Sequence, residues 1–444
     1  MAPGPAGRDY PPCGVKQKMR AALTTRGSYR DVTPFLTLAL ELRRRGHDPV
    51  LGLPPTFERD VKALDLAFQP VGPGLTYSEL ARRRAFANLA SYSRVDVIRG
   101  YESVGQLIDL CDGADLLISG TGLIAASIVH EVTHIPFVSI QLEPSAAGLS
   151  QRFLIGEAID PIAGEVNRCR ELHGLPQVFG IRSIESISPQ LALCAMNPHF
   201  HEYLAGPHGC HRQTGFFSLE GIGMTAESDL LDFVSKHDPP IVFAFGDTVR
   251  NQQESLATML IEAAQIAGVP AIIESPPGWS GNGCSRQVVY AAEFIDYDWI
   301  FPRAACVVHP NRLTAIAPSI RSGVPGICVF DDETEPGWQA LARELGYPAF
   351  RYHELDAATL AAAIDTAISS SGALRSAASL REQVREEDGV KKAASLIEEF
   401  LESAGLVDGR SLTVQWAKTQ EAPDSTRRKA LQHGLRQRRN NLSV

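Results

Sequence analysis

Asp31 is the residue of this 444-residue chain best placed to do chemistry, because it is the one carboxylate of a polar loop at residues 26–32. The loop follows the apolar run Ala21–Thr25, which predicts a buried strand, and precedes apolar residues at helical spacing. In a doubly wound sheet, ligands gather at the carboxyl ends of the strands, where this loop lies. A carboxylate there can accept hydrogen bonds from a ligand. The alternative is that Asp31 only caps the helix that follows.

The helix that must hold this carboxylate has clear end signals. Thr33 and Pro34 predict its cap and first turn, and Gly46 predicts its end. A second strand is expected at residues 50–53, so that strand, loop, helix and strand form one parallel unit. His47 follows the helix end, where a cation complements the helix dipole, and we interpret it as structural.

Short apolar strands alternate with helical patterns twice along the chain. This βαβ alternation predicts an α/β protein with two Rossmann-like, doubly wound parallel-sheet lobes that face a central cleft. The expected strands lie near residues 20–25, 48–53, 67–71, 114–119, 136–141, 191–196, 240–246, 271–275, 288–294, 306–309, 326–330 and 348–352.

Changes in composition divide the chain into six expected parts. The first residues are rich in Pro and Gly without an apolar signal segment, and the last are polar and basic. We interpret the tail as a solvated extension, with docking or RNA contact as the alternative. The parts are a flexible leader at 1–17, a first lobe at 18–222, a linker region at 223–236, a second lobe at 237–388, a closing helix at 389–405 that can cross back to the first lobe, and a disordered tail at 406–444.

The composition excludes several classes of protein. With 44% hydrophobic and 21% charged residues, the chain can bury two cores, and no apolar stretch reaches the roughly 18 residues that a membrane span requires. Eight cysteines occur without a CxxC spacing, so we expect reduced thiols of a cytoplasmic protein and no zinc or disulfide framework. A net charge of -9 argues against a general nucleic-acid binder.

A series of motifs, in order along the chain, points to a known family. Residues 27–34 read Gly-Ser-Tyr-Arg-Asp-Val-Thr-Pro, against a family opening of G-[ST]-R-G-D-V-x-P. The chain resembles the bacterial glycosyltransferases of the two-lobed GT-B fold that are similar to sterol glucosyltransferases and to antibiotic glycosyltransferases of the vancomycin and macrolide type. The resemblance runs from about residue 18 to 406, and its further motifs are Gly113–Leu116, Ile135–Val138, Asp298–Arg303, Arg321–Pro325 and Arg385–Val390.

The resemblance implies transfer of a sugar from a nucleotide diphosphate sugar to a hydroxyl of a lipid-like or natural-product acceptor, with inversion at the anomeric carbon. Asp31 matches the proposed general base. The first lobe would bind the acceptor and the second the nucleotide sugar, which is a co-substrate. No resident cofactor or metal and no nucleic acid is implied. Mg²⁺ is possible but not expected, and a homodimer is possible.

The phosphate-binding motif of the second lobe departs from the family. The family run H-H-G-G-A-G-T-T holds the diphosphate at a helix N-terminus, and this chain has His309, Pro310, Asn311, Arg312, Leu and Thr314 in its first six positions. Pro310 removes a backbone N–H, and side chains replace the two glycines. Arg312 could offer a bidentate fork to phosphate oxygens and Thr314 a hydroxyl. Alternatively, Arg312 is a solvated loop charge.

Two further segments of the sugar-nucleotide site are altered. The last two positions of the family turn G-F-G-S are Gly246 and Asp247 in this chain, and Thr248 follows them. The Asp247 carboxylate would repel a diphosphate unless it binds a cation or faces a sugar hydroxyl. In the family segment G-D-Q-P, Thr334 and Glu335 take the places of Asp and Gln. Glu335 can still accept hydrogen bonds from sugar hydroxyls, although carboxylates on loops are commonly solvated.

The remaining expected contacts are mainly aromatic. Ser28 of the opening loop, Trp279 of a Pro-Pro-Gly-Trp loop and Phe294 complete the expected sugar-nucleotide contacts, with Phe294 either stacking on the base or lying in the core.

Four residues are candidates for acceptor binding. Between residues 75 and 101 the sequence offers an aromatic and cationic surface, or alternatively a plain amphipathic helix with a basic face. The candidates are Tyr77, Tyr92, Arg94 and Tyr101.

Three hypotheses follow. The first is a glycosyltransferase with a nonstandard sugar-nucleotide site and Asp31 as base, which the complete opening loop favours. The second is a catalytically inactive pseudo-glycosyltransferase that acts as a binding or partner-activating subunit, which the loss of the His-Gly-Gly run favours. The third, an epimerase or lyase acting on a nucleotide sugar, has no support in the residues beyond the fold.

Overall fold

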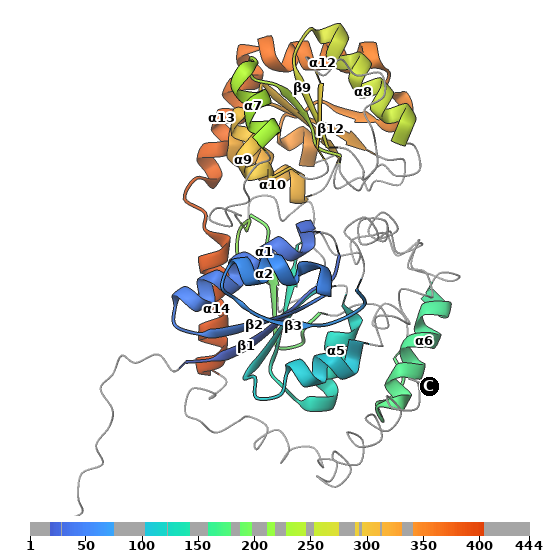
Figure 1. The fold of residues 1–444 in the computed structure, drawn as a ribbon, viewed down its shortest axis with the longest axis vertical. Helices are drawn as coiled ribbons and strands as arrows, with labels where there is room; N and C mark the ends of the chain where they lie inside the picture. Colours follow the sequence, from blue (N-terminus) through green and yellow to red (C-terminus); the bar gives the residue numbers. More distant parts are fainter. Residues whose placement is uncertain are drawn as a thin grey trace, which may run out of the picture.

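The chain forms two lobes, one above the other, each built on its own parallel sheet (Figure 1). The lower lobe carries the N-terminal half and the upper lobe the C-terminal half. The structure is a computed structural model. It describes residues 18–27, 29–74, 103–121, 123–142, 159–178, 187–197, 211–217, 228–245, 253–274, 289–292, 295–310, 313–330 and 341–403.

The sheet of the lower lobe has the order β3-β2-β1-β4-β5-β6-β7. Because β1 pairs with β2 on one side and β4 on the other, the direction of winding reverses at its carboxyl end, where doubly wound sheets bind ligands. The strands are β1 (Arg20–Thr24), β2 (Asp48–Leu53), β3 (Ala67–Pro70), β4 (Leu116–Gly120), β5 (Phe137–Gln141), β6 (Leu191–Cys194) and β7 (His211–Gln213).

The sheet of the upper lobe has the order β10-β9-β8-β11-β12-β13, with its reversal between β8 and β11. The two separate parallel sheets confirm the predicted α/β class, and every expected strand has its counterpart. The strands are β8 (Ile241–Phe243), β9 (Ala271–Glu274), β10 (Val289–Ala292), β11 (Cys306–Pro310), β12 (Gly326–Phe330) and β13 (Ala349–Arg351).

Helices cover the faces of both sheets, and several begin at side-chain caps. Asp296, Asp356 and Ser370 accept hydrogen bonds from backbone N–H groups at the starts of α9, α12 and α13. The helices are α1 (Tyr29–Arg44), α2 (Glu58–Ala63), α5 (Ile124–Thr133), α6 (Ile159–Leu172), α7 (Ser228–Lys236), α8 (Gln253–Ala267), α9 (Tyr297–Ile300), α10 (Leu313–Ser322), α12 (Ala357–Ser369), α13 (Ser371–Val384) and α14 (Gly389–Ser403). Short 3₁₀ turns lie at η1 (Pro55–Phe57), η6 (Phe301–Arg303) and η7 (Tyr352–Glu354).

Helix α1 begins earlier than its sequence signals indicated. Its first residue is Tyr29 rather than Pro34, so the proline lies inside the helix. The Thr33 hydroxyl donates a hydrogen bond to the Tyr29 carbonyl oxygen at 2.6 Å, which is bonding within a helix and not capping. Asp31 therefore lies in the first turn of α1 instead of in the preceding loop.

The segment expected to link the lobes, residues 223–236, contains α7, which belongs to the upper lobe. Leu230 and Phe233 of this helix are buried in one core with Val242 of β8 and Ile300 of α9. An apolar helix face must be covered, and here the second sheet covers it.

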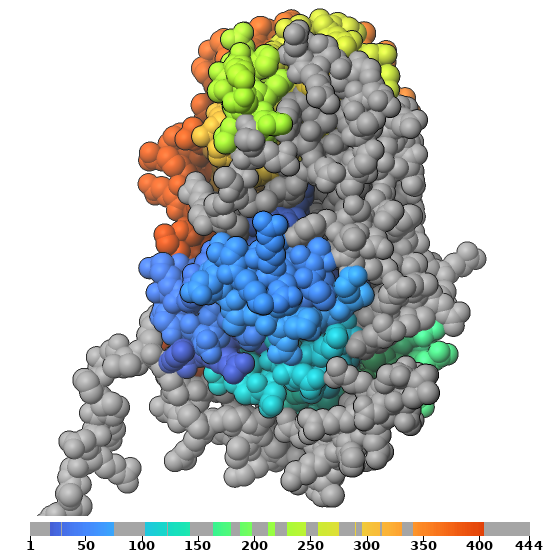
Figure 2. All heavy atoms as spheres, in the orientation of Figure 1, coloured from blue at the N-terminus to red at the C-terminus, as the bar shows by residue number. Residues whose placement is uncertain are grey.

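The C-terminal helices join the lobes. After α13 of the upper lobe the chain crosses back, and α14 packs on α1 of the lower lobe, as the sequence predicted. Ile397 and Leu401 of α14 share a buried core with Leu38 and Leu42 of α1. In Figure 2 the orange atoms of this crossing run along one edge of the molecule down to the blue atoms of the lower lobe.

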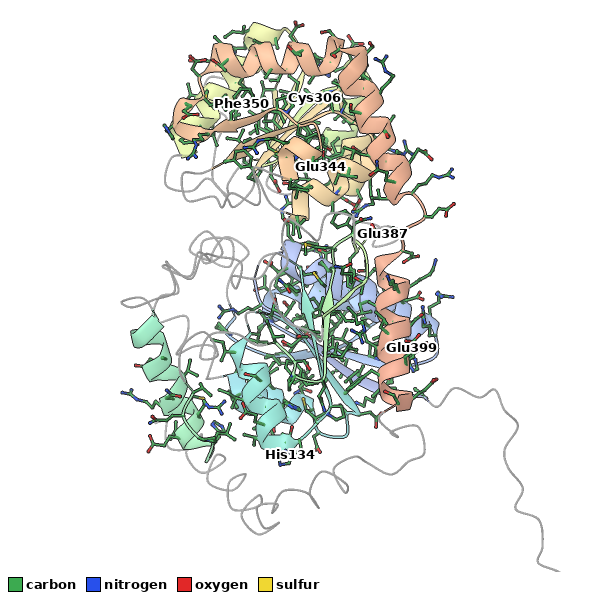
Figure 3. The ribbon with its side chains drawn as sticks, turned by 180° about the vertical axis from the view of Figure 1, so that it is seen from behind. His134, Cys306, Glu344, Phe350, Glu387 and Glu399 are labelled. Atoms are coloured by element: carbon green, nitrogen blue, oxygen red, sulfur yellow. The ribbon has the colours of Figure 1, made fainter. Side chains whose placement is uncertain are left out.

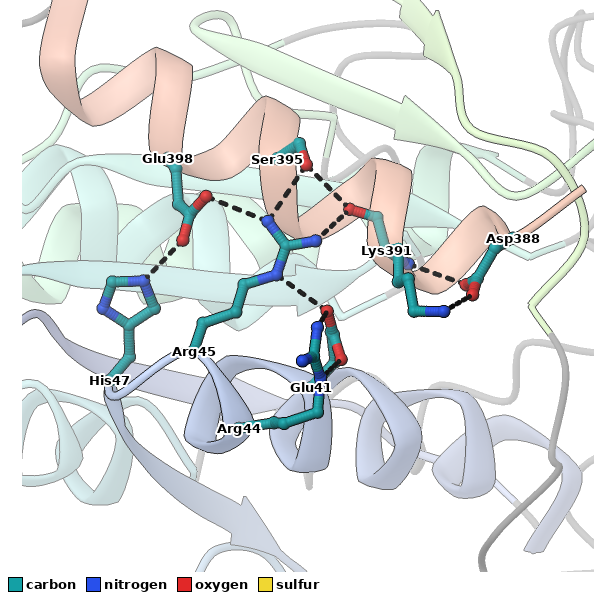
Figure 4. A network of polar contacts seen from close by, with 8 residues as sticks. All are labelled: Glu41, Arg44, Arg45, His47, Asp388, Lys391, Ser395 and Glu398. Carbon is teal, nitrogen blue, oxygen red and sulfur yellow. Dashed lines mark hydrogen bonds and ion pairs between the residues drawn. The ribbon is translucent and has the colours of Figure 1, made fainter. Parts of the chain in front are cut away.

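A polar network at the end of α1 fixes α14 to the lower lobe (Figure 4). The Arg45 guanidinium donates from Nε to Glu41 Oε1 at 2.8 Å and from Nη1 to Glu398 Oε2 at 2.9 Å. His47 Nδ1 accepts from the Met19 N–H at 3.3 Å, so its Nε2 carries the proton that Glu398 accepts at 3.0 Å. His47 thus has the structural role expected for it.

The five cysteines in the described part of the chain are buried free thiols. Burial raises the pKa of Cys111, Cys169, Cys194 and Cys306 to about 12, so these thiols stay protonated near neutral pH. Cys306 lies inside the upper lobe (Figure 3). Among the described residues, the helices are all too short or too polar to cross a bilayer.

Candidate active site

The carboxylate of Asp31 lies just beyond the carboxyl end of β1. Gly27 has a φ of +124°, and a Cβ added to it would collide with the Asp31 carboxylate. The half-buried Asp31 side chain is therefore packed directly on the Gly27 backbone. Gly27 serves two purposes, because it turns the chain into α1 and leaves room for the carboxylate.

Next to this turn, a cleft lies between the two lobes. Arg30 and Pro34 line it from the lower lobe, and Leu313, Thr314 and Arg321 line it from one face of α10 in the upper lobe. It encloses about 730 Å³ of empty space, open solvent at its mouth included, and most of its lining is apolar. Asp31 itself is not among the lining residues. A cleft of this kind between two domains is a usual place for a small-molecule site.

Arg30 crosses from the lower lobe to the upper lobe. Its Nη2 donates to Oε1 of Glu274, the last residue of β9, and the Tyr297 hydroxyl donates to Oε2 of the same carboxylate. The Arg30 guanidinium carbon lies 3.7 Å from the centroid of the Tyr297 ring, within cation–π distance. That ring stacks in turn on Phe301 at 4.5 Å.

Charged residues of α9 and α10 line or border the upper wall of the cleft. Burial is the largest cause that raises the pKa of Asp296, followed by the charge of Asp298. Arg321 donates from Nη2 to Asp298 Oδ1 at 2.7 Å, and its buried Nη1 has no hydrogen-bond partner among the described residues. The upper wall of the cleft therefore carries both negatively and positively charged side chains.

The chain passes from α13 to α14 next to Phe216, which lines the cleft. Glu387 lies at this passage (Figure 3), and its carboxylate packs against Gly215, which has a φ of +98°. Burial raises the pKa of Glu387, while hydrogen bonds from the Phe216 N–H and the Asn197 side chain, and the charges of Arg321 and Lys392, oppose the shift.

Comparison with known proteins assigns this architecture. The chain matches no model of a known protein family. It is 28% identical over 413 residues to the O-mycaminosyltylonolide 6-deoxyallosyltransferase of Streptomyces fradiae, which covers 84% of this chain and 95% of that protein. In sequence the chain is similar to bacterial glycosyltransferases, and its fold is the GT-B fold. It is similar in structure to the glycosyltransferase SnogD from Streptomyces nogalater, with a TM-score of 0.66 and 16% identity over 86% of this chain and 100% of that one.

A second GT-B neighbour was solved with a nucleotide. The glycosyltransferase VinC in complex with dTDP is similar with a TM-score of 0.62 and 17% identity over 85% of this chain and 99% of that chain.

The structure places two of the residues expected in the sugar-nucleotide site. Thr314 lies in the first turn of α10 and lines the cleft. His309 is fully buried in β11, its Nδ1 is 2.9 Å from the carbonyl oxygen of Pro310, and its ring lies against Tyr347. The ring therefore lies in the core rather than in the cleft. Burial lowers the pKa of His309 to about 4, so the ring is neutral near pH 7.

The other candidate residues lie outside the described residues, and their roles stay predictions. In the sugar-nucleotide site these are Ser28, Gly246, Asp247, Thr248, Trp279, Phe294, Asn311, Arg312, Thr334 and Glu335, and in the acceptor site Tyr77, Tyr92, Arg94 and Tyr101.

Sequence reasoning missed the residues that join the lobes at the cleft, namely Arg30, Glu274 and Tyr297. One signal was available, because Glu274 is the single charged residue at the end of the otherwise apolar strand Ala-Ile-Ile-Glu. A buried carboxylate at the carboxyl end of a strand requires a partner. The sequence does not identify that partner, which lies 244 residues away.

Proposed function

We propose that this protein is a glycosyltransferase that moves a sugar from a nucleoside diphosphate sugar to a hydroxyl of a small natural-product or lipid-like acceptor, with inversion and with Asp31 as general base. The observation that carries the proposal is the place of Asp31, which is packed on Gly27 at the winding reversal of the first sheet, one residue from the cleft-lining Arg30. General bases must lie within hydrogen-bond reach of the proton that they remove.

The chemistry divides between the lobes. The acceptor hydroxyl gives its proton to Asp31 as its oxygen attacks the anomeric carbon on the face opposite the diphosphate, so the C–O bond to the diphosphate breaks and the configuration inverts. The departing diphosphate carries the negative charge toward the N-terminus of α10, where the helix dipole and the Thr314 hydroxyl favour an anion. The dTDP bound to VinC supports a nucleoside diphosphate as leaving group.

The cleft and the relatives support the acceptor class. Leu142, Phe216, Phe217 and Leu313 give the cleft an apolar lining, which suits the body of an apolar acceptor with few polar groups. The Streptomyces fradiae relative is named for transferring a 6-deoxyallosyl group to O-mycaminosyltylonolide.

The direct test is Asp31→Asn, with Asp60→Asn as matched control. Both residues are acidic and lie in the first turn of a helix of the lower lobe, so both substitutions remove the same charge at the same kind of position. Asp31→Asn should lower kcat by about 10² to 10⁴, the usual contribution of a general base, while the dissociation constants of nucleotide and acceptor stay nearly unchanged. Asp60→Asn should keep the wild-type rate. Full activity of Asp31→Asn would reduce this residue to a structural role.

A specific observation favours a second candidate, an inactive binding or partner-activating subunit. Pro310 at the end of β11 has no backbone N–H, where the family motif brings a histidine to the diphosphate. Titration calorimetry with UDP, dTDP and GDP, with and without Mg²⁺, separates the two. If Arg312 replaces the missing contacts, Arg312→Ala should weaken binding by about 1.5 to 3 kcal/mol. Absence of binding to any nucleotide by the folded protein would select the inactive subunit.

A further inference from the structure

Arg30 stands where the resembled opening motif has a glycine, and it forms a contact that a glycine cannot form. The Arg30 and Glu274 side chains come from different lobes and are 14% and 3% exposed. Both carboxylate oxygens of Glu274 are used, one by Arg30 and the other by the Tyr297 hydroxyl. We call these three side chains the interlobe clasp.

Removing one member of the clasp while the others stay is energetically unfavourable. Glu274 is buried at the end of β9, so loss of Arg30 would leave its negative charge with the Tyr297 hydroxyl as the remaining partner among these three side chains. Removing one member of a buried ion pair is strongly unfavourable because the other charge stays desolvated. The guanidinium also covers the face of the Tyr297 ring, so a lysine would replace only part of the contact.

The first turn of α1 depends on such an anchor. Pro34 has no N–H, so the Arg30 carbonyl oxygen cannot receive the helical hydrogen bond that residue 34 would otherwise donate. The Thr33 hydroxyl bonds to Tyr29 and not to Arg30. The turn that carries Asp31 is therefore held less firmly by its own helix, and the Arg30 side chain ties it to the upper lobe.

We propose that Arg30 is a positioning residue, which sets the place of Asp31 relative to the sugar-nucleotide lobe through the interlobe clasp. The proposal rests on the proposed role of Asp31 as the base. The base lies in one lobe and the expected diphosphate site in the other, so the rate of transfer depends on their relative position, and a misplacement of about 1 Å can cost about 10²-fold in rate.

The first test compares Arg30→Ala, Glu274→Gln and the double variant. Each single variant should lower kcat about 10-fold or more with little change in KM for the nucleotide sugar, and the double variant should be no slower than the slower single variant, because both remove one contact. Arg30→Lys should recover part of the rate. The matched control is Arg303→Ala, which removes a cation–π contact with Trp299 inside the upper lobe. It should keep the wild-type kcat.

Three kinetic results would overturn the proposal. Multiplicative effects of Arg30→Ala and Glu274→Gln would show that they act separately. A rise in KM with unchanged kcat would make Arg30 a substrate-binding residue. An equal loss of rate in Arg303→Ala would show a general response to lost arginine contacts.

A second measurement needs no activity. Small-angle X-ray scattering should show a larger radius of gyration for Arg30→Ala and Glu274→Gln than for the wild type and Arg303→Ala, since the lobes lose a side-chain connection. Equal radii of gyration in all four proteins would show that the clasp does not hold the lobes together. If the wild type transfers no sugar but the radii differ as expected, the proposed function fails while the clasp stands.

Discussion

Gly27→Ala tests whether the position of Asp31 sets the rate. The substitution has two costs, and the structure separates them. The backbone φ of +124° disfavours an alanine by about 1–3 kcal/mol. In addition, the new methyl would meet the Asp31 carboxylate, and it would lie 2.9 Å from the Asp31 Cβ, where ordinary contacts are 3.4–4 Å. Asp31 must therefore retreat by roughly half an ångström at its Cβ and further at its carboxylate.

Gly46→Ala is the matched control at the other end of α1. Gly46 also has a positive φ, +94°, but a Cβ there meets no atom within 4 Å, so this variant carries only the backbone cost. Gly46→Ala should lower the free energy of unfolding by about 1–3 kcal/mol in urea titrations, and Gly27→Ala should lower it further because the clash adds to the same backbone cost. Only Gly27→Ala should lower kcat, by about 10²-fold, because it alone moves the proposed base.

A double-variant cycle completes the assay. With Asp31→Ala in the background the clash with the carboxylate is absent and only the 2.9 Å contact with the Cβ of residue 31 remains, so Gly27→Ala should cost less stability than it does in the wild type. The reasoning is refuted if Gly27→Ala and Gly46→Ala have the same kcat per folded molecule, or if the cost of Gly27→Ala is the same with and without the Asp31 side chain.

Three further predictions concern stability. Glu398→Ala should lower the free energy of unfolding by about 1–3 kcal/mol, measured with urea, because Arg45 and His47 lose their shared buried carboxylate while Arg45 keeps its bond to Glu41; an unchanged urea midpoint would contradict this. Burial lowers the pKa of His309 to about 4, so between pH 6.5 and pH 4 this histidine is protonated in the unfolded chain and neutral in the folded chain. The free energy of unfolding therefore falls as the pH drops from 6.5 toward 4. His309→Leu should remove on the order of 2 kcal/mol of this loss at pH 5, visible as a smaller difference between urea midpoints at pH 7.5 and pH 5. Burial raises the pKa of Glu387, so its contribution to stability is present at low pH and lost as the pH rises through the raised value. Glu387→Gln should therefore raise the melting temperature more at pH 8 than at pH 5, and an equal change at both would contradict the assignment.

The fold was predictable because buried parallel strands have a direct sequence pattern. Runs such as Leu116–Gly120 and Cys306–Pro310 are buried at every position, which requires nearly continuous apolar residues. The exception is β7, His211–Gln213, whose three polar residues give no such signal. It joins the sheet through backbone hydrogen bonds to β6, which any sequence can form.

The site was less predictable because its residues depend on contacts that the sequence does not contain. Thr33 and Pro34 favour a helix start, yet α1 starts at Tyr29, because Gly27 has already turned the chain and Thr33 bonds back along the helix. His309 occupies a motif position, but every residue of its strand is buried. Spacing along the chain does not show on which face of a strand a ring lies when both faces are covered.

The two lobes are joined in different ways at the crossing and at the clasp. At the crossing from α13 to α14 the contact is between backbones, since a Cβ on Gly389 would lie 2.5 Å from the carbonyl oxygen of Phe216. Such a contact leaves no room to slide. At the start of α1 the lobes meet through the side chains of Arg30, Glu274 and Tyr297, which can separate by rotation about side-chain bonds. The contact at the clasp therefore depends on side chains alone, whereas the contact at the crossing depends on the backbone.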